Sequence, residues 1–171
     1  MIEYKLAPNL RILFVGINPH PGSHRRHVPF SNNKTLWYLL NRAGLLNENE
    51  DDLRHDRSLR QMYDERFMPQ YRLGFTNLVK RPTPRVTDLR KGEAKPGVQR
   101  ALREIQTYRP KVACFIGKIT YMVFRGTRDC SYGWQENIGD TQVYVMHFPI
   151  RGPASIRIAE FQELKEATRE S

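Results

Sequence analysis

Apolar residues in this sequence form two kinds of run: short continuous stretches, and longer stretches with a helical period. Continuous runs occupy RILFVGI (residues 11–17), KVACFIGK (111–118) and TQVYVMHFP (141–149), and a shorter one opens the segment 73–89. Short runs without polar alternation are typical of strands that are buried on both faces. These four segments therefore predict a parallel sheet covered by helices on each side.

Helical periodicity appears between the predicted strands. The segment 33–46 has apolar residues at 36, 37, 39, 40 and 43, and a glycine at 44 supplies a stop signal. Further helices are predicted over 95–110 and 155–170, with a short one over 119–126. The polar segment 47–72 is expected to be a peripheral loop with some helix. This alternation predicts one three-layer α/β/α domain over residues 1–171, with a mainly parallel sheet of about four strands.

Three unusual loops follow three of these strands: Asn18 to Phe30, Lys80 to Arg85, and His147 to Ser155. Ligands of parallel sheets bind beyond the carboxyl ends of the strands, so the loops are expected to gather at one edge. The formal charge of +10 favours an anionic partner, nucleic acid first, over a merely basic surface. The position of cations in or beside these loops supports that choice and predicts one basic groove, lined by Arg25, Arg26, Lys34, Lys80, Arg81, Arg85, Arg151 and Arg157.

Several classes of protein do not fit the sequence. No apolar run approaches the ~18 residues of a membrane span, and the first residues lack the layout of a signal peptide. We therefore expect an intracellular, cytoplasmic protein without a membrane partner, associated with the nucleoid if it is bacterial. Two cysteines are too few for a disulfide framework, and Cys114 is expected to be a plain buried thiol. No P-loop and no G-x-S-x-G motif is present.

Three sequence blocks together resemble one family. GINP at residues 16–19, with PF ten residues later and an aromatic residue near the start of the next helix, resembles the mismatch-specific uracil/thymine-DNA glycosylases of the uracil-DNA glycosylase superfamily. GFTNLVKRPTPRVTDL (74–89) is similar to the second block of that family, and YRPKVACFIGKITY (108–121) to its third. The blocks keep their order and spacing over roughly residues 10–164.

The resemblance implies a uracil-DNA glycosylase-like fold and cleavage of the bond between deoxyribose and a damaged or mismatched base, most of all uracil or thymine opposite guanine. It implies a monofunctional enzyme that works on double-stranded DNA as a monomer, without metal or redox cofactor. Asn18 matches the asparagine that orients water, and Ile17, Phe30 and Asn77 form the expected base-binding set. Residues expected to contact DNA or to enter it as a wedge are His20, Arg25, Arg26, Lys80, Arg81, Lys118, Ile150, Arg151, Gly152, Pro153 and Ser155.

The residue types suit this chemistry. Departure of the base leaves a cationic sugar and an anionic base, so the site must separate charge and place a weak nucleophile. An amide such as Asn18 can orient water without acting as a base, which predicts slow catalysis and a preference for good leaving groups or weakly paired bases. Backbone N–H groups after the strand can stabilise the base anion, and Phe30 offers a stacking face worth ~1–3 kcal/mol.

The last block departs from the family pattern, which has Asn-Pro-Ser, His-Pro-Ser or Met-Pro-Ser where this chain has MHFPIRGPAS (146–155). In a first register His147 takes the first motif position and donates to the base carbonyl, and we assign it a catalytic role on that basis. In a second register Pro149 takes the motif proline, Phe148 occupies the polar position, and activity on uracil is weak. Ile150, Arg151 and Pro153 are wedge candidates in both.

Structural interpretations compete with these assignments. Asn18 before a proline can simply cap a turn, Phe30 can belong to the core, and Trp37 is expected to do so. The spacing of His20, His24 and His27 is not a strong zinc pattern, but it leaves a metal-dependent hydrolase as a third hypothesis. The second is a non-catalytic or divergent nucleic-acid binding module on the same fold, with salt-sensitive binding and no turnover.

Overall fold

The computed structural model describes residues 1–170 and has an α/β architecture around one five-stranded sheet. The strands are β1 (Ile12–Gly16), β2 (Leu73–Asn77), β3 (Val112–Ile116), β4 (Gly133–Ile138) and β5 (Thr141–Met146). Their order across the sheet is β2-β1-β3-β5-β4. Pairs among the first four in this order are parallel, and only β4 runs antiparallel to its neighbour β5. The predicted fold class is confirmed, with one strand more than expected.

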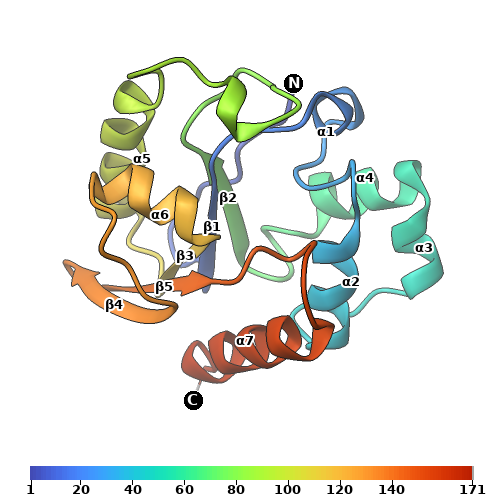
Figure 1. Cartoon of the computed structure of the whole chain (residues 1–171). Helices are drawn as coiled ribbons and strands as arrows, with labels where there is room; N and C mark the ends of the chain where they lie inside the picture. The colour runs from blue at the N-terminus through green and yellow to red at the C-terminus, as the bar shows by residue number, and fades with distance from the viewer. Residues whose placement is uncertain (171) are drawn as a thin grey trace.

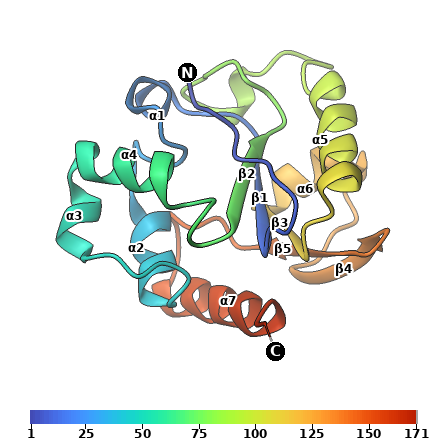
Figure 2. The ribbon, with the colours of Figure 1, turned by 180° about the vertical axis from the view of Figure 1, so that it is seen from behind.

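The helices form a layer on each face of the sheet, as Figures 1 and 2 show from opposite sides. α5 (Lys95–Tyr108) and α6 (Lys118–Arg125) cover one face, and α2 (Thr35–Arg42) and α7 (Ala154–Ala167) lie over the other. Three further helices pack beside α2 or follow the first strand: α1 (Pro21–Arg26), α3 (Glu50–Arg54) and α4 (Asp56–Glu65). A 3₁₀ turn, η1, spans Val86–Asp88.

Two apolar clusters hold these layers together. Ile12 and Phe14 of β1 face the cluster that contains α2, α4 and α7, whereas Leu13 and Val15 face the cluster beneath α5 and α6. Successive side chains of a strand point to opposite faces, so continuous apolar strands are what a doubly covered sheet requires. Trp37 and Cys114 are both buried, as the sequence predicts.

Three local predictions need correction. The helix predicted over 33–46 is shorter, because the Asn33 side chain accepts from the N–H of Thr35 and Gly44 adopts a left-handed conformation. The first loop contains α1, so Arg25 and Arg26 lie on a helix. The segment 47–72 is not peripheral, since it supplies these core residues: Leu53, Leu59, Met62, Tyr63 and Phe67. Within residues 1–170 no helix combines the length and apolar character needed to cross a bilayer.

Candidate active site

A cavity of about 250 Å³ lies where the carboxyl ends of the parallel strands meet the following loops. All three loops singled out in the sequence contribute to its wall: the loop and short helix after β1, the loop after β2, and the loop after β5. Its lining residues include Ile17, Asn18, Phe30, Phe75, Asn77, Thr83, Phe148 and Ile150. The parallel topology therefore converges these loops at one edge, as expected.

Asn18 is half-buried in this cavity, and hydrogen bonds fix the orientation of its side-chain amide. Nδ2 donates to the main-chain oxygen of Arg81 at 3.0 Å and to Oγ1 of Thr83 at 2.8 Å. The Thr83 hydroxyl donates its own proton to the main-chain oxygen of Arg85 at 2.6 Å, so it can only accept from Asn18. Both partners of the amide are thus acceptors, and Nδ2 must face them. The acceptor atom Oδ1 is left for a water or a ligand.

Two aromatic rings and a buried amide also line the cavity. The ring of Phe30 meets the ring of Phe75 edge to face, with centroids 5.9 Å apart. The backbone of Phe30 has a φ of 55°, which residues other than glycine rarely adopt. Phe30 therefore both packs on the core and faces the cavity. Asn77 is 2% exposed, and its side-chain amide has no hydrogen-bond partner among residues 1–170. Its amide is available to a ligand in the cavity.

Gly16 lies beneath both of these side chains at the end of β1. A Cβ atom at this position would lie 2.5 Å from Oδ1 of Asn77 and 3.2 Å from Cζ of Phe30. Real side chains do not tolerate the first distance, so any larger residue would displace the amide. Gly16 of the GINP motif is therefore required because Asn77 and Phe30 leave no room for a Cβ atom beneath the cavity.

The cations near the cavity are partly neutralised by carboxylates, which corrects the expectation of one basic groove. Arg81 pairs with Glu93 through two contacts of 2.7 and 2.8 Å, and the hydrogen bond from Arg81 lowers the pKa of Glu93 to about 2. Arg26 and Lys34 both pair with Asp56, at 3.3 and 2.6 Å. Ion pairs of this kind neutralise the cations and also hold the loops that carry them.

Other predicted DNA-facing residues keep more open positions. Arg25, Lys80 and Arg85 are exposed, and Arg85 lines the cavity. Lys80 lies over the ring of Tyr4 at 5.5 Å, and Lys118 over the ring of Tyr132 at 4.4 Å. The exposed residues between His147 and Ser155 are Phe148, Ile150, Arg151, Gly152, Pro153, Ala154 and Ser155, of which the last two begin α7.

Two of the three histidines of the first loop have hydrogen-bond partners, whereas Nδ1 of His24 is buried without one among residues 1–170. Nδ1 of His20 accepts from the N–H of Gly22 at 3.0 Å and so caps α1, while His20 also lines the cavity. His27 contacts the amino terminus at 3.0 Å. Among residues 1–170 no three His, Cys, Asp or Glu side chains are arranged to hold a metal ion.

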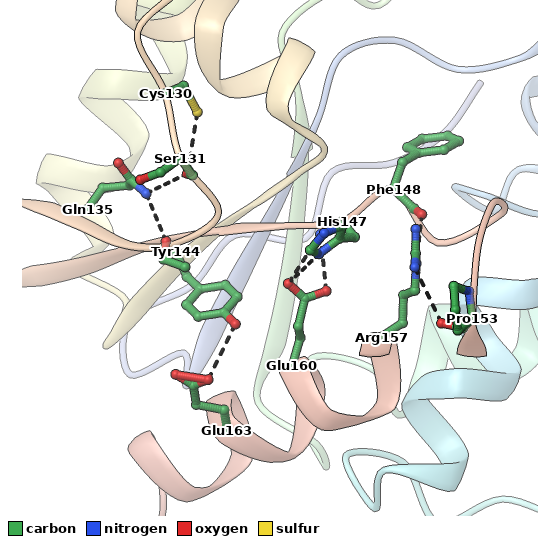
Figure 3. A network of polar contacts seen from close by, with 11 residues as sticks. Cys130, Ser131, Gln135, Tyr144, His147, Phe148, Pro153, Arg157, Glu160 and Glu163 are labelled. Carbon is green, nitrogen blue, oxygen red and sulfur yellow. Dashed lines mark hydrogen bonds and ion pairs between the residues drawn. The ribbon is translucent and has the colours of Figure 1, made fainter. Parts of the chain in front are cut away.

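The structure does not bring His147 into the cavity wall. Its main-chain N–H and its Nδ1 both contact the carboxylate of Glu160, and its ring stacks on Tyr132 with centroids 3.5 Å apart. Figure 3 shows His147 beside Glu160, with Phe148 extending away from it. Phe148 is the residue of this pair that lines the cavity, which is the arrangement of the second sequence register.

Several residues of the site have no obvious signal in the sequence. Thr83 lies between two prolines and reads as part of a turn, although it orients Asn18. Phe75 reads as an ordinary strand residue. Arg157 and Glu160 read as polar positions of an amphipathic helix, although both are buried. Each of these roles depends on a contact with a distant segment, which a local pattern cannot reveal.

Comparison with known protein families gives one match over almost the whole described chain. The family model described as Uracil DNA glycosylase superfamily matches residues 4–168. The match contains all five strands, the cavity and its three loops.

Proposed function

Because the chain belongs to the uracil DNA glycosylase superfamily, we propose that it removes a damaged or mismatched base from duplex DNA by hydrolysing the N-glycosidic bond. Membership supports the coarser statement, a DNA-binding glycosylase of DNA repair. The finer proposal is a monofunctional, mismatch-type enzyme that acts as a monomer inside the cell and leaves an abasic site. Its preferred substrates are uracil or thymine opposite guanine.

The orientation of Asn18 carries this proposal. Two acceptors hold Nδ2 of a side chain that lines the cavity, which supports a role for Oδ1 as the acceptor of a hydrogen bond from a water. A water held there is placed to attack C1′ as the base departs with the electron pair of the N-glycosidic bond. The proton that the water loses as the new C–O bond forms neutralises the anionic base. The sugar passes through a cationic state, so a neutral amide suffices to direct the nucleophile.

The rest of the cavity supplies base recognition. In this proposal the flipped base stacks on Phe30, contacts the main chain of Ile17 and pairs with the free amide of Asn77. Main-chain N–H groups after β1 stabilise the anionic base as it leaves. Stacking on one aromatic ring contributes ~1–3 kcal/mol.

Slow chemistry and easy extrusion follow from the same residues. An amide activates water less than a carboxylate would, so the enzyme depends on bases that leave well or pair poorly. Extrusion of a base costs a few kcal/mol, and it costs least when the base is mismatched or damaged. In the second register, with Phe148 in the cavity wall, no polar side chain of this loop donates to the base, which predicts weak activity on uracil.

The test is a panel of duplexes that carry uracil opposite guanine, uracil opposite adenine, thymine opposite guanine, an etheno adduct or hypoxanthine, scored for alkali-labile breaks. We expect breaks with the wild type, fastest at the mispairs, and no more than a small residual rate with Asn18→Ala, which retains DNA binding. Equal excision by Asn18→Ala would refute the role of Asn18. Salt-sensitive binding without a break on any duplex would favour the non-catalytic binding module.

A further inference from the structure

Two charged side chains of α7 are buried and point to the loop after β5. Arg157 is 6% exposed and Glu160 8% exposed, and they lie three residues apart on one helix. Such side chains are seldom buried unless they are paired. Figure 3 shows both of them reaching the segment from His147 to Pro153, from the same side. This loop carries Phe148 and Ile150, which we call the lip, since both line the cavity and are 42% exposed.

Arg157 joins the two ends of this loop. Its Nε donates to the main-chain oxygen of Phe148 at 3.1 Å, and its Nη1 donates to that of Pro153 at 3.3 Å. Gly152 has a φ of 86° and packs against the guanidinium, where a Cβ atom would lie 2.8 Å from Nη1. The loop therefore needs glycine at this position both for its backbone and for the approach of Arg157.

Glu160 holds the start of the loop. Its carboxylate accepts from the main-chain N–H of His147 at 3.1 Å and lies 3.0 Å from Nδ1 of the same residue. The imidazole is clamped on its face by Tyr132, with the two rings inclined by 18°. The ammonium of Lys118 lies 4.4 Å from the centre of the Tyr132 ring. Glu160 thus holds the start of the loop through two contacts with His147, and the ring of His147 is in turn held by Tyr132.

From these contacts we infer that Arg157 and Glu160 are positioning residues, which hold the lip at the mouth of the cavity while contacting neither base nor sugar. The inference rests on the proposed function, in which the lip helps to part the base steps and to keep the base extruded. Apolar side chains can act as wedges between base steps, and such side chains are placed precisely only when supporting contacts hold them. Loss of the α7 contacts should therefore impair action on duplex DNA, where the base must be extruded, more than on a single strand.

The experiment compares single-turnover base release from a duplex and from a single strand that carry the same lesion. The variants are Arg157→Met, Arg157→Lys, Glu160→Ala and Gly152→Ala, the last of which disturbs the same contact from the loop side. Glu163→Ala is the matched control, because Glu163 lies one turn further along α7 and contacts Trp134 and Tyr144 instead of the loop. We expect the ratio of duplex to single-strand rates to fall on the order of 10- to 100-fold in the first, third and fourth variants.

Arg157→Lys should give an intermediate ratio, since lysine keeps the charge but cannot reach both carbonyl oxygens at once. Glu163→Ala should keep the wild-type ratio. A general loss of stability would lower both rates together and leave the ratio unchanged, and that result would overturn the inference.

Amide hydrogen exchange provides a readout that does not depend on activity. Exchange of residues 147–153 should accelerate in Glu160→Ala and Gly152→Ala, while exchange of β5 stays as in the wild type. Unchanged exchange in the loop would overturn the inference. If the wild type releases no base from either substrate, the proposed function fails, and the exchange result alone decides whether α7 holds the lip.

Discussion

The substitution Thr83→Val tests whether Thr83 orients the side-chain amide of Asn18. The hydroxyl of Thr83 accepts one of the two hydrogen bonds that fix the Asn18 amide, and it is itself 4% exposed. Valine has nearly the same shape but cannot accept, so the amide keeps only its bond to the main chain of Arg81. The amide then samples other orientations, and Oδ1 spends less time facing the water that it should hold.

The magnitude follows from the contacts that are lost. One neutral hydrogen bond contributes about 0.5–1.5 kcal/mol, which corresponds to a rate loss of about 2- to 13-fold if the whole of it is used to orient the amide. Valine also leaves the main-chain oxygen of Arg85 without its donor at 2.6 Å. We expect the free energy of unfolding to fall by about 1–3 kcal/mol in addition.

The assay is the single-turnover rate of base release at saturating enzyme, measured for Thr83→Val, Thr83→Ser and both changes combined with Asn18→Ala. Thr83→Ser keeps the hydroxyl and should stay close to the wild type. Because Thr83 acts through Asn18, the change to valine should have no further effect on the residual rate of Asn18→Ala. A wild-type rate for Thr83→Val, or an equal loss in both backgrounds, would refute the reasoning.

Three further predictions concern the cavity floor, the loop after β2 and the packing of α5. Gly16→Ala should weaken binding of DNA that carries a flipped-base analogue, as measured by fluorescence anisotropy, because its Cβ would displace Asn77; unchanged affinity would contradict this. The hydrogen bond from Arg81 lowers the pKa of Glu93 from 4.5 to about 2, so its contribution to stability is present above pH 4.5 and is lost as the pH falls toward 2; urea midpoints across this range should depend less on pH in Glu93→Gln. Gly97→Ala should lower the free energy of unfolding by about 1–3 kcal/mol or more in urea titrations, since its Cβ would overlap the main-chain carbonyl that follows β2.

The sequence reveals much of this fold because burial in a parallel sheet leaves a strong local signal. β1 and β3 are apolar at nearly every position, and only a sheet covered on both faces accepts such strands. β4 has no such signal. Its sequence GWQENI is mostly polar because it is the exposed edge of the sheet, and it is held there by pairing with β5 across the turn at Gly139.

The candidate site is only partly visible in the sequence, for a related reason. Asn18 and Phe30 are found because a motif places them directly after a strand. The partners that orient Asn18 lie 63 and 65 residues further along the chain. The α7 residues that hold the lip contact Phe148 and His147, which lie 9 and 13 residues before them. The sequence also suggests that cations beside loops are free to bind DNA, whereas Arg81 and Arg157 are occupied by protein partners. Charge pairing of this kind is decided by tertiary structure.

The most direct test of the account is a crystal structure of the protein with duplex DNA that carries a non-hydrolysable, 2′-fluorinated deoxyuridine opposite guanine. The uracil ring should lie inside the cavity, stacked on Phe30 and within hydrogen-bond distance of the Asn77 amide. A water should lie between Oδ1 of Asn18 and C1′ of the sugar, on the side opposite the base. A base bound outside the cavity, or an Asn18 amide turned so that Oδ1 faces Thr83, would contradict the account.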